Sequence, residues 1–157
     1  MASLRQSTQA YNKDIVMTPS GANDVVQCFA DFPVVTLVIN DIIEMVPLPA
    51  DCVLIDLIVD IPDMDTSTGF VFDAGLMSGD WGQRSNSRTC GAEFISASTG
   101  GQAAAIVRPN VTGYTKVAPA AVDRSIGLKV TTAASGTAAT TGTIRVTALF
   151  RPQRDTV

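Results

Sequence analysis

The sequence predicts an all-β fold: one antiparallel β-sandwich, jelly-roll-like, that follows an extended N-terminal arm. Three observations favour this class. Short runs of β-branched and aromatic residues recur along the chain, with glycine, proline or polar turn residues between them. No segment keeps the helical period of about 3.6 residues over several turns. Residues 125–132 and 143–151 alternate apolar and polar side chains, as half-buried strands do.

The chain has 157 residues, which fits a single domain. Residues 1–12 are polar and lack periodicity, so residues 1–17 are expected to form an exposed arm. Residues 18–157 then form one β-sandwich domain. With roughly eight strands available, a jelly roll is the leading architecture.

The first strands are expected in residues 25–30 and 34–40. The second run reads VVTLVIN and is dense in β-branched residues. Residues 41–46 either extend that strand or follow it after a kink. Further strands are expected in residues 70–73, 102–107, 114–117, 125–132 and 143–151. Residues 92–95 are either a strand or a helical turn, and the small, polar connection 133–142 is interpreted as a hairpin loop.

Residues 53–61 read VLIDLIVDI and form the most apolar strand candidate. Helical spacing would also place Asp56 and Asp60 on one face. The β-branched content and the flanking Pro49 and Pro62 favour a strand instead. The strand period then predicts that the odd-numbered residues face the core: Val53, Ile55, Leu57, Val59 and Ile61.

Charge is divided unevenly along the chain. Residues 41–80 hold nine acidic and no basic residues, whereas residues 81–157 hold nine basic and three acidic residues. Either the fold keeps these stretches apart, which gives one acidic and one basic face, or the strands interleave and the charges cancel locally. The net charge of −4 argues against nucleic acid as a partner.

Charged residues make up only 17% of the chain, which indicates a surface partly covered in an assembly. No apolar run is long enough to cross a bilayer, and the N-terminus lacks the apolar core of a signal peptide, so no membrane partner is expected. Cys28, Cys52 and Cys90 are expected to be buried free thiols of a protein made in a reducing cytoplasm. A zinc site would need closely spaced cysteines or histidines, so no metal and no other cofactor is expected.

The sequence contains no histidine, which excludes Ser-His-Asp and Cys-His catalysis. Lys13, Lys116 and Lys129 lie in no recognisable motif that would make one of them a base. Paired carboxylates could serve a glycosidase, which makes a carbohydrate-binding or glycan-degrading β-sandwich the main alternative. That alternative predicts a groove lined by Trp81, a tyrosine and paired acids.

Two loops invite a ligand-binding interpretation. Residues 60–69, DIPDMDTSTG, cluster three carboxylates but lack the spacing of a calcium loop, so an acidic turn is favoured. Residues 75–82, GLMSGDWG, fit neither phosphate-binding glycine pattern. Glycines that permit unusual backbone angles explain this second loop better.

Ordered blocks of sequence carry a family resemblance. They are DAGLMSGDWGQRSNSRTCGAEFISAST at residues 73–99, VRP at 107–109, DRSIGLKV at 123–130 and GTIRVTALFRP at 142–152, preceded by VPLPADCVLIDLIVDI at 46–61. In this order they resemble the cement, or head-decoration, proteins of tailed-bacteriophage capsids, over residues 34–152. No block contains a catalytic motif.

The resemblance implies a structural virion protein, and no enzyme, on the outside of an icosahedral shell. Its partners would be the major capsid protein and itself, as a homo-dimer or homo-trimer. Another virion component, such as a tail protein, is a further alternative. Arg84 and Arg88 lie in a polar loop of the most family-like block and are expected to contact the capsid or another subunit. Arg124 is a third interface candidate, although an ion pair with Asp123 at a strand edge is the more ordinary role.

Overall fold

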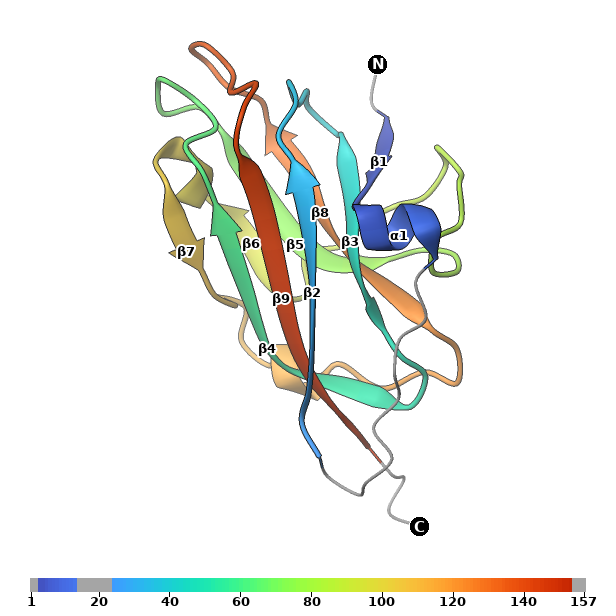
Figure 1. The fold of residues 1–157 in the computed structure, drawn as a ribbon. Helices are drawn as coiled ribbons and strands as arrows, with labels where there is room; N and C mark the ends of the chain where they lie inside the picture. Colours follow the sequence, from blue (N-terminus) through green and yellow to red (C-terminus); the bar gives the residue numbers. More distant parts are fainter. Residues whose placement is uncertain (1–2, 14–23, 154–157) are drawn as a thin grey trace.

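The computed structural model describes residues 3–13 and 24–153, which form two β-sheets packed face to face (Figure 1). The strand orders are β1-β3-β8-β5-β6 and β2-β9-β4-β7. The strands are β1 (Leu4–Gln6), β2 (Val26–Pro33), β3 (Ile42–Leu48), β4 (Cys52–Ile61), β5 (Val71–Met77), β6 (Ile95–Ser98), β7 (Ala105–Val107), β8 (Arg124–Thr132) and β9 (Thr143–Pro152). The short helices are α1 (Thr8–Asn12), η1 (Gly100–Gln102) and η2 (Tyr114–Lys116). The predicted all-β sandwich is confirmed.

The strand pairing follows the jelly-roll pattern. β2 pairs with β9, β3 with β8, β4 with β7 and β5 with β6, each time antiparallel. The chain is therefore arranged like one long hairpin that has been rolled up, so that successive pairs alternate between the two sheets. β9 also pairs with β4, and β8 with β5, which joins the pairs within each sheet.

The inner faces of the two sheets meet in one apolar core. The alternation predicted for the last two strands is present. The core includes Ile126, Leu128 and Val130 of β8 and Ile144, Val146, Ala148 and Phe150 of β9. Phe150 is fully buried. Each large side chain buried in this way contributes roughly 1.5–3 kcal/mol.

β4 follows the predicted inward face only in its second half. Its register against β9 shifts between Leu54 and Asp56, which makes Ile55 the extra residue of a β-bulge. Cys52 and Leu54 face the core before the bulge, and Leu57, Val59 and Ile61 face it afterwards. Val53 is buried, with 4% exposed, but it does not belong to this core cluster, and Ile55 is only half-buried. The predicted inward face therefore holds for Leu57, Val59 and Ile61 alone, because one extra residue reverses the alternation.

Residues 34–40 form a loop, not the expected strand, and Asp41 explains why. Its buried carboxylate accepts hydrogen bonds from the backbone N of Val38 (3.1 Å) and of Ser3 (2.9 Å) and from Arg5 Nε (3.2 Å). Burial raises the pKa of Asp41, but these hydrogen bonds outweigh it and hold the pKa below its usual value. The side chain thus bends the chain into a turn that the β-branched composition does not predict.

Three further segments differ from expectation. Residues 114–116 form the 3-10 helix η2 where a strand was expected. The connection 133–142 is not a hairpin loop, because it links β8 in one sheet to β9 in the other. Residues 92–95 were expected to be either a strand or a helical turn, and β6 begins only at Ile95 and runs to Ser98.

The N-terminal residues 3–13 also differ from the expected exposed arm. β1 pairs in parallel with β3, and α1 packs against β2 and β3 at the side of the sandwich (Figure 1). Ser7 and Ala10 are fully buried there, and Ser7 caps α1 by accepting a hydrogen bond from Ala10 N. Residues 1–2 and 14–17 of the expected arm lie outside the described residues, so its boundary at residue 17 stays a prediction.

The unevenly divided charges lie on interleaved strands, so they cancel locally. Arg88 forms an ion pair with Glu44 of β3, with an N···O distance of 2.7 Å. Arg108 pairs with Asp56 of β4. Of the two charge arrangements that the sequence left open, the interleaved one is present. Within residues 3–13 and 24–153, no helix has the length and apolar character needed to cross a membrane.

Candidate interaction surface

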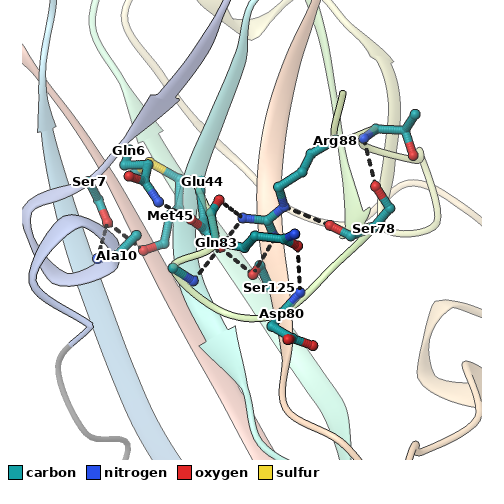
Figure 2. A network of polar contacts seen from close by, with 12 residues as sticks. Gln6, Ser7, Ala10, Glu44, Met45, Ser78, Asp80, Gln83, Arg88 and Ser125 are labelled. Carbon is teal, nitrogen blue, oxygen red and sulfur yellow. Dashed lines mark hydrogen bonds and ion pairs between the residues drawn. The ribbon is translucent and has the colours of Figure 1, made fainter. Parts of the chain in front are cut away.

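Residues 78–90, between β5 and β6, fold over the outer face of the sheet that contains β3 and β8 (Figure 2). Glu44 of β3 and Ser125 of β8 point outward from that sheet, away from the core. Both are nevertheless fully buried, because this loop covers them. A buried carboxylate is tolerated only when its charge is paired and its oxygens accept hydrogen bonds.

Arg88 supplies that pairing from within the loop. Its Nη1 donates to Glu44 Oε1 at 2.7 Å, and its Nη2 donates to Ser125 Oγ at 2.9 Å. Its Nε and Nη1 also donate to the backbone oxygens of Ser78 (2.6 Å) and Gln83 (3.0 Å). The guanidinium therefore binds the start and the middle of the loop and the sheet beneath it, as Figure 2 shows.

Glu44 accepts hydrogen bonds from three other segments. Besides Arg88, its Oε1 accepts from the backbone N of Gly82 (3.0 Å) and from the Ser125 hydroxyl, and its Oε2 accepts from Gln6 Nε2 at 2.5 Å. The carboxylate thus joins β1, β3, β8 and the loop. This network fixes the position of the loop and of the N-terminal segment together.

The loop and the N-terminal helix α1 touch directly. The guanidinium of Arg84 lies 4.1 Å from the ring centroid of Tyr11, and its Nη2 donates to Tyr11 O at 3.3 Å. Gly82 has a φ of +70°, and a Cβ there would lie 2.6 Å from Lys13 Cγ. Only glycine fits this position, because both the backbone angle and the close approach of α1 exclude a side chain.

Trp81 lies at the centre of the surface that results. Two adjoining open hollows share Lys13, Asp80 and Trp81. One extends over Tyr11 and Arg84, and the other over Val122 and Asp123. We call the set Tyr11, Lys13, Asp80, Trp81, Arg84 and Val122 the Trp81 surface. Tyr11 and Val122 are each more than half exposed, at 58% and 60%.

The structure places the two expected loop arginines in different environments. Arg84 is exposed and belongs to the Trp81 surface. Arg88 is buried, with only 2% of its side chain exposed, so the expectation that it contacts a partner does not fit its position. The polar composition of the loop suggested two exposed arginines, but one of them neutralises Glu44.

Arg124 lies apart from the other two arginines. Asp123 does not pair with it and instead accepts a hydrogen bond from Ala50 N at 2.8 Å. Among the described residues, Arg124 Nε and Nη2 are buried and have no hydrogen-bond partner. Burial lowers the pKa of this guanidinium, and the nearby Glu93 acts in the opposite direction.

The acidic stretch at residues 60–69 serves the backbone of its own turn. The Asp65 carboxylate is buried and accepts hydrogen bonds from the backbone N of Ser67, Gly69, Ser135 and Gly136, at 2.8–3.0 Å. It therefore joins this turn to the 133–142 connection. No cluster of ligands suited to a metal ion occurs in the part of the chain that the structure describes.

Glu44, Ser125 and Tyr11 are the residues of this region that sequence reasoning did not identify. Glu44 had a recognisable signal: it is the one charged residue in IIEMVPL, a run that is otherwise apolar. Such an isolated acid inside a strand indicates a buried carboxylate that needs a cationic partner. Nothing local to Ser125 or Tyr11 reveals that they lie beside the loop.

The chain is similar to chains in solved structures of phage capsids. No family model and no curated protein matches the chain. A chain in the structure of the capsid of Ralstonia phage GP4 is 33% identical, with a TM-score of 0.90, and the match covers 98% of this chain and 100% of that chain. A chain in the capsid asymmetric unit of cyanophage Pam1 is 16% identical, with a TM-score of 0.55, over 88% of this chain and 94% of that one. The second match shows a shared fold alone.

Proposed function

Because this chain belongs to the family of the Ralstonia phage GP4 capsid chain and is a structural protein of a phage virion, we propose that it binds the outside of the assembled shell and cements neighbouring major capsid subunits. The observation that carries this proposal is the match itself. It covers 98% of this chain and 100% of the relative, so no part of the relative lacks a counterpart here. The role requires binding and no catalysis.

Stabilisation of the shell would follow from mass action. A protein that binds assembled subunits, but not separated ones, shifts the equilibrium toward the assembled state. Such a protein needs a rigid contact surface, because ordering flexible loops on binding reduces the affinity. The buried contacts of Glu44 and Arg88 supply that rigidity to the loop 78–90.

We assign the capsid contact to the Trp81 surface. Tryptophan, tyrosine and arginine are the residue types that contribute most to binding at protein interfaces, and Trp81, Tyr11 and Arg84 lie together here. Val122 adds an exposed apolar side chain at the neighbouring hollow. The surface combines segments distant in sequence, so it exists only in the folded protein.

The experiment is to add the purified protein to capsids that were assembled without it. Bound copies are counted by gel densitometry and cryo-electron microscopy, and shell stability is measured by thermal release of the genome. Wild-type protein is expected to bind and to raise the release temperature. Arg84→Glu combined with Val122→Asp is expected to lower the affinity about tenfold or more, since hot-spot losses exceed about 1.4 kcal/mol.

Lys116→Glu is the matched control, because it reverses an exposed cation on η2 outside the Trp81 surface. It is expected to bind like the wild type. Normal occupancy by the Arg84→Glu/Val122→Asp variant would reject the Trp81 surface as the contact. Failure of the wild-type protein to bind assembled capsids would reject the cement function.

One observation favours a second candidate, glycan binding. The groove expected for a carbohydrate site required Trp81, a tyrosine and paired acids. One hollow brings Trp81 and Tyr11 together with Asp80, and a second acid, Asp123, lines the adjoining hollow. A glycan array and a hydrolysis assay on bacterial surface polysaccharides test this function. Binding that Trp81→Ala abolishes would support it, and two blank assays would remove it.

A further inference from the structure

Another hollow lies where the second half of the loop 78–90 meets β1, β3 and β8. Its lining includes Ser3, Asn40, Asn86, Arg88, Thr89 and Lys129. Its volume of about 220 Å³ is below the roughly 300–1,000 Å³ of pockets for drug-sized molecules, so it suits one small chemical group. We call it the Lys129 hollow.

Four polar side chains of the Lys129 hollow have no hydrogen-bond or ion-pair partner within residues 3–13 and 24–153. They are the amides of Asn40 and Asn86, the hydroxyl of Thr89 and the ammonium of Lys129. All four are able to donate hydrogen bonds. Unpaired donors that line one concave site indicate a ligand that accepts hydrogen bonds.

Two other polar side chains of the lining already have partners. The Ser3 hydroxyl donates to the buried carboxylate of Asp41 at 3.1 Å. The guanidinium of Arg88 is neutralised by Glu44 and donates to the backbone of its own loop, as described above. These two side chains therefore hold the walls of the hollow in place and leave its charge to Lys129.

Lys129 is a cation without a counter-ion. It is half-buried, whereas lysines are mostly exposed, and it forms no ion pair among the described residues. No carboxylate lines the hollow. Asp73, its register neighbour on β5, accepts a hydrogen bond from Ala97 N at 2.7 Å, and the nearby Glu93 accepts one from Leu76 N at 2.8 Å. The ammonium is thus left to an anion from outside the chain.

A carboxylate is the anion that matches these groups. One ammonium balances its single charge, whereas a phosphate group carries about two charges at neutral pH. A carboxylate has about four acceptor positions, and the hollow offers four side chains that donate. The contact with the ammonium would be a charge-assisted hydrogen bond, which is stronger than a bond between neutral groups.

From these features we propose that the Lys129 hollow binds the carboxylate of an aspartate or glutamate side chain of the capsid partner. The source of the carboxylate rests on the proposed function. The hollow adjoins the proposed contact, because the loop 78–90 contributes Asp80, Trp81 and Arg84 to the Trp81 surface and Asn86 and Thr89 to the hollow. A subunit bound at the Trp81 surface therefore lies beside the hollow.

The first experiment uses the isolated protein, with acetate as the probe. Acetamide has nearly the same shape without the charge and is the control ligand. The amide signals of Asn86 and Thr89 are followed by heteronuclear NMR. Acetate is expected to shift them saturably, with a dissociation constant in the millimolar range, and acetamide is not. Absence of a saturable shift with acetate, or equal shifts with both ligands, would overturn the proposal.

Substitution of Lys129 tests its role in this binding. Lys129→Met keeps the length of the side chain, removes its charge and is expected to weaken acetate binding about tenfold or more. Lys129→Arg keeps the charge and is expected to retain binding. Thermal melting verifies that both variants are folded. Unchanged acetate binding by folded Lys129→Met would contradict the site.

The second experiment tests the source of the carboxylate. Lys129→Met is expected to bind assembled capsids about tenfold or more weakly than the wild type, since a charge pair within an interface is lost. Lys116→Met is the matched control, because it makes the same substitution at an exposed lysine outside both surfaces.

The outcomes separate the site from the cement function. Acetate binding together with normal capsid affinity of Lys129→Met would reject the capsid carboxylate as the occupant and leave the cement function intact. Failure of the wild type to bind capsids would reject the cement function and this source with it. The acetate titration would then still decide for or against a carboxylate site in the Lys129 hollow.

Discussion

Arg88 Nη1 lies 2.7 Å from Glu44 Oε1 in an ion pair that joins residues 44 positions apart, and neither side chain is more than 2% exposed. This pair connects an external loop to the sheet beneath it through a fully buried contact. It also determines where the exposed residues of the same loop point, because Gly82, next to Trp81, donates to the same carboxylate oxygen. The buried pair is therefore a structural contribution to the Trp81 surface.

Removing one partner of this pair is expected to lower the free energy of unfolding substantially. Arg88→Met leaves the Glu44 charge buried and unpaired, which costs about 3–5 kcal/mol. The measurement is urea unfolding followed by the fluorescence of Trp81, the one tryptophan of the chain. The double variant Glu44→Leu/Arg88→Met removes both charges and is expected to recover most of the loss. A cost below about 1 kcal/mol for Arg88→Met would contradict the buried-charge account.

The same pair shows where sequence reasoning reached its limit. Local polarity correctly predicted a loop around residues 78–90, and Arg84 is exposed as expected. The same polarity says nothing about Glu44, which reaches the loop from a distant strand. Whether an arginine in a polar loop is free or buried depends on such a long-range partner.

The strands likewise have features that local sequence predicts and features that depend on distant residues. β8 and β9 were predictable because every second residue of each is apolar and the residues between them are mostly polar or glycine. β4 was predictable as a strand, but the bulge at Ile55 reflects its pairing with β9 and has no local signal. Residues 34–40 have strand composition, yet the Asp41 carboxylate binds the backbone of that segment and of the N-terminus. Side chains that bond to backbone groups override propensity in these places.

Gly82 is expected to be intolerant of a side chain. Gly82→Ala places a Cβ 2.6 Å from Lys13 Cγ and 3.0 Å from Ala10 O, at a φ of +70°. Strain and displacement of α1 are expected to cost about 2–3 kcal/mol and to shift the emission of Trp81. Gly113→Ala is the control, since Gly113 has a φ of +85° but no atom within 4 Å of the added Cβ. Gly113→Ala is expected to lower the free energy of unfolding by about 1 kcal/mol. An equal loss for Gly82→Ala and Gly113→Ala would show that α1 does not constrain position 82.

The cysteines are expected to react slowly in the folded protein. Burial raises the pKa of the Cys28 and Cys90 thiols to about 12, and burial also raises the pKa of Cys52. At pH 8 roughly one Cys90 thiol in ten thousand is then ionised, and only the thiolate reacts. Labelling with a disulfide reagent should be slow in buffer and reach all three thiols in denaturant. Fast labelling of Cys90 in buffer, located by mass spectrometry, would contradict its burial.

These thiols also affect stability at high pH. Because their pKa values are raised in the folded state, the unfolded chain ionises first as the pH rises above 9.0. The stabilising effect of the neutral thiols is therefore complete below pH 9 and decreases above it. Cys28→Ser/Cys90→Ala is expected to reduce this decrease in urea unfolding measured between pH 8 and pH 10.5.

Asp65 is expected to control stability on the acidic side. Burial raises the pKa of its carboxyl, but the backbone N–H donors of Ser135, Gly136, Ser67 and Gly69 outweigh that effect and lower the pKa far below 3.8. Above pH 3.8 the charged carboxylate is therefore more stable in the folded state than in the unfolded chain. As the pH falls below 3.8, the unfolded chain takes up the proton first and stability is lost.

Asp65→Asn should accordingly be less stable than the wild type at pH 6. The difference in stability between the two proteins should become smaller as the pH falls toward 2. An amide keeps one acceptor oxygen, so it loses the charge and only part of the hydrogen bonding. Asp24→Asn, at an exposed position, is the matched control and is expected to keep the wild-type pH profile. The measurement is the urea midpoint at several pH values between 2 and 6. Parallel profiles for Asp65→Asn and the wild type would mean that the link between the 60–69 turn and the 133–142 connection does not depend on this charge.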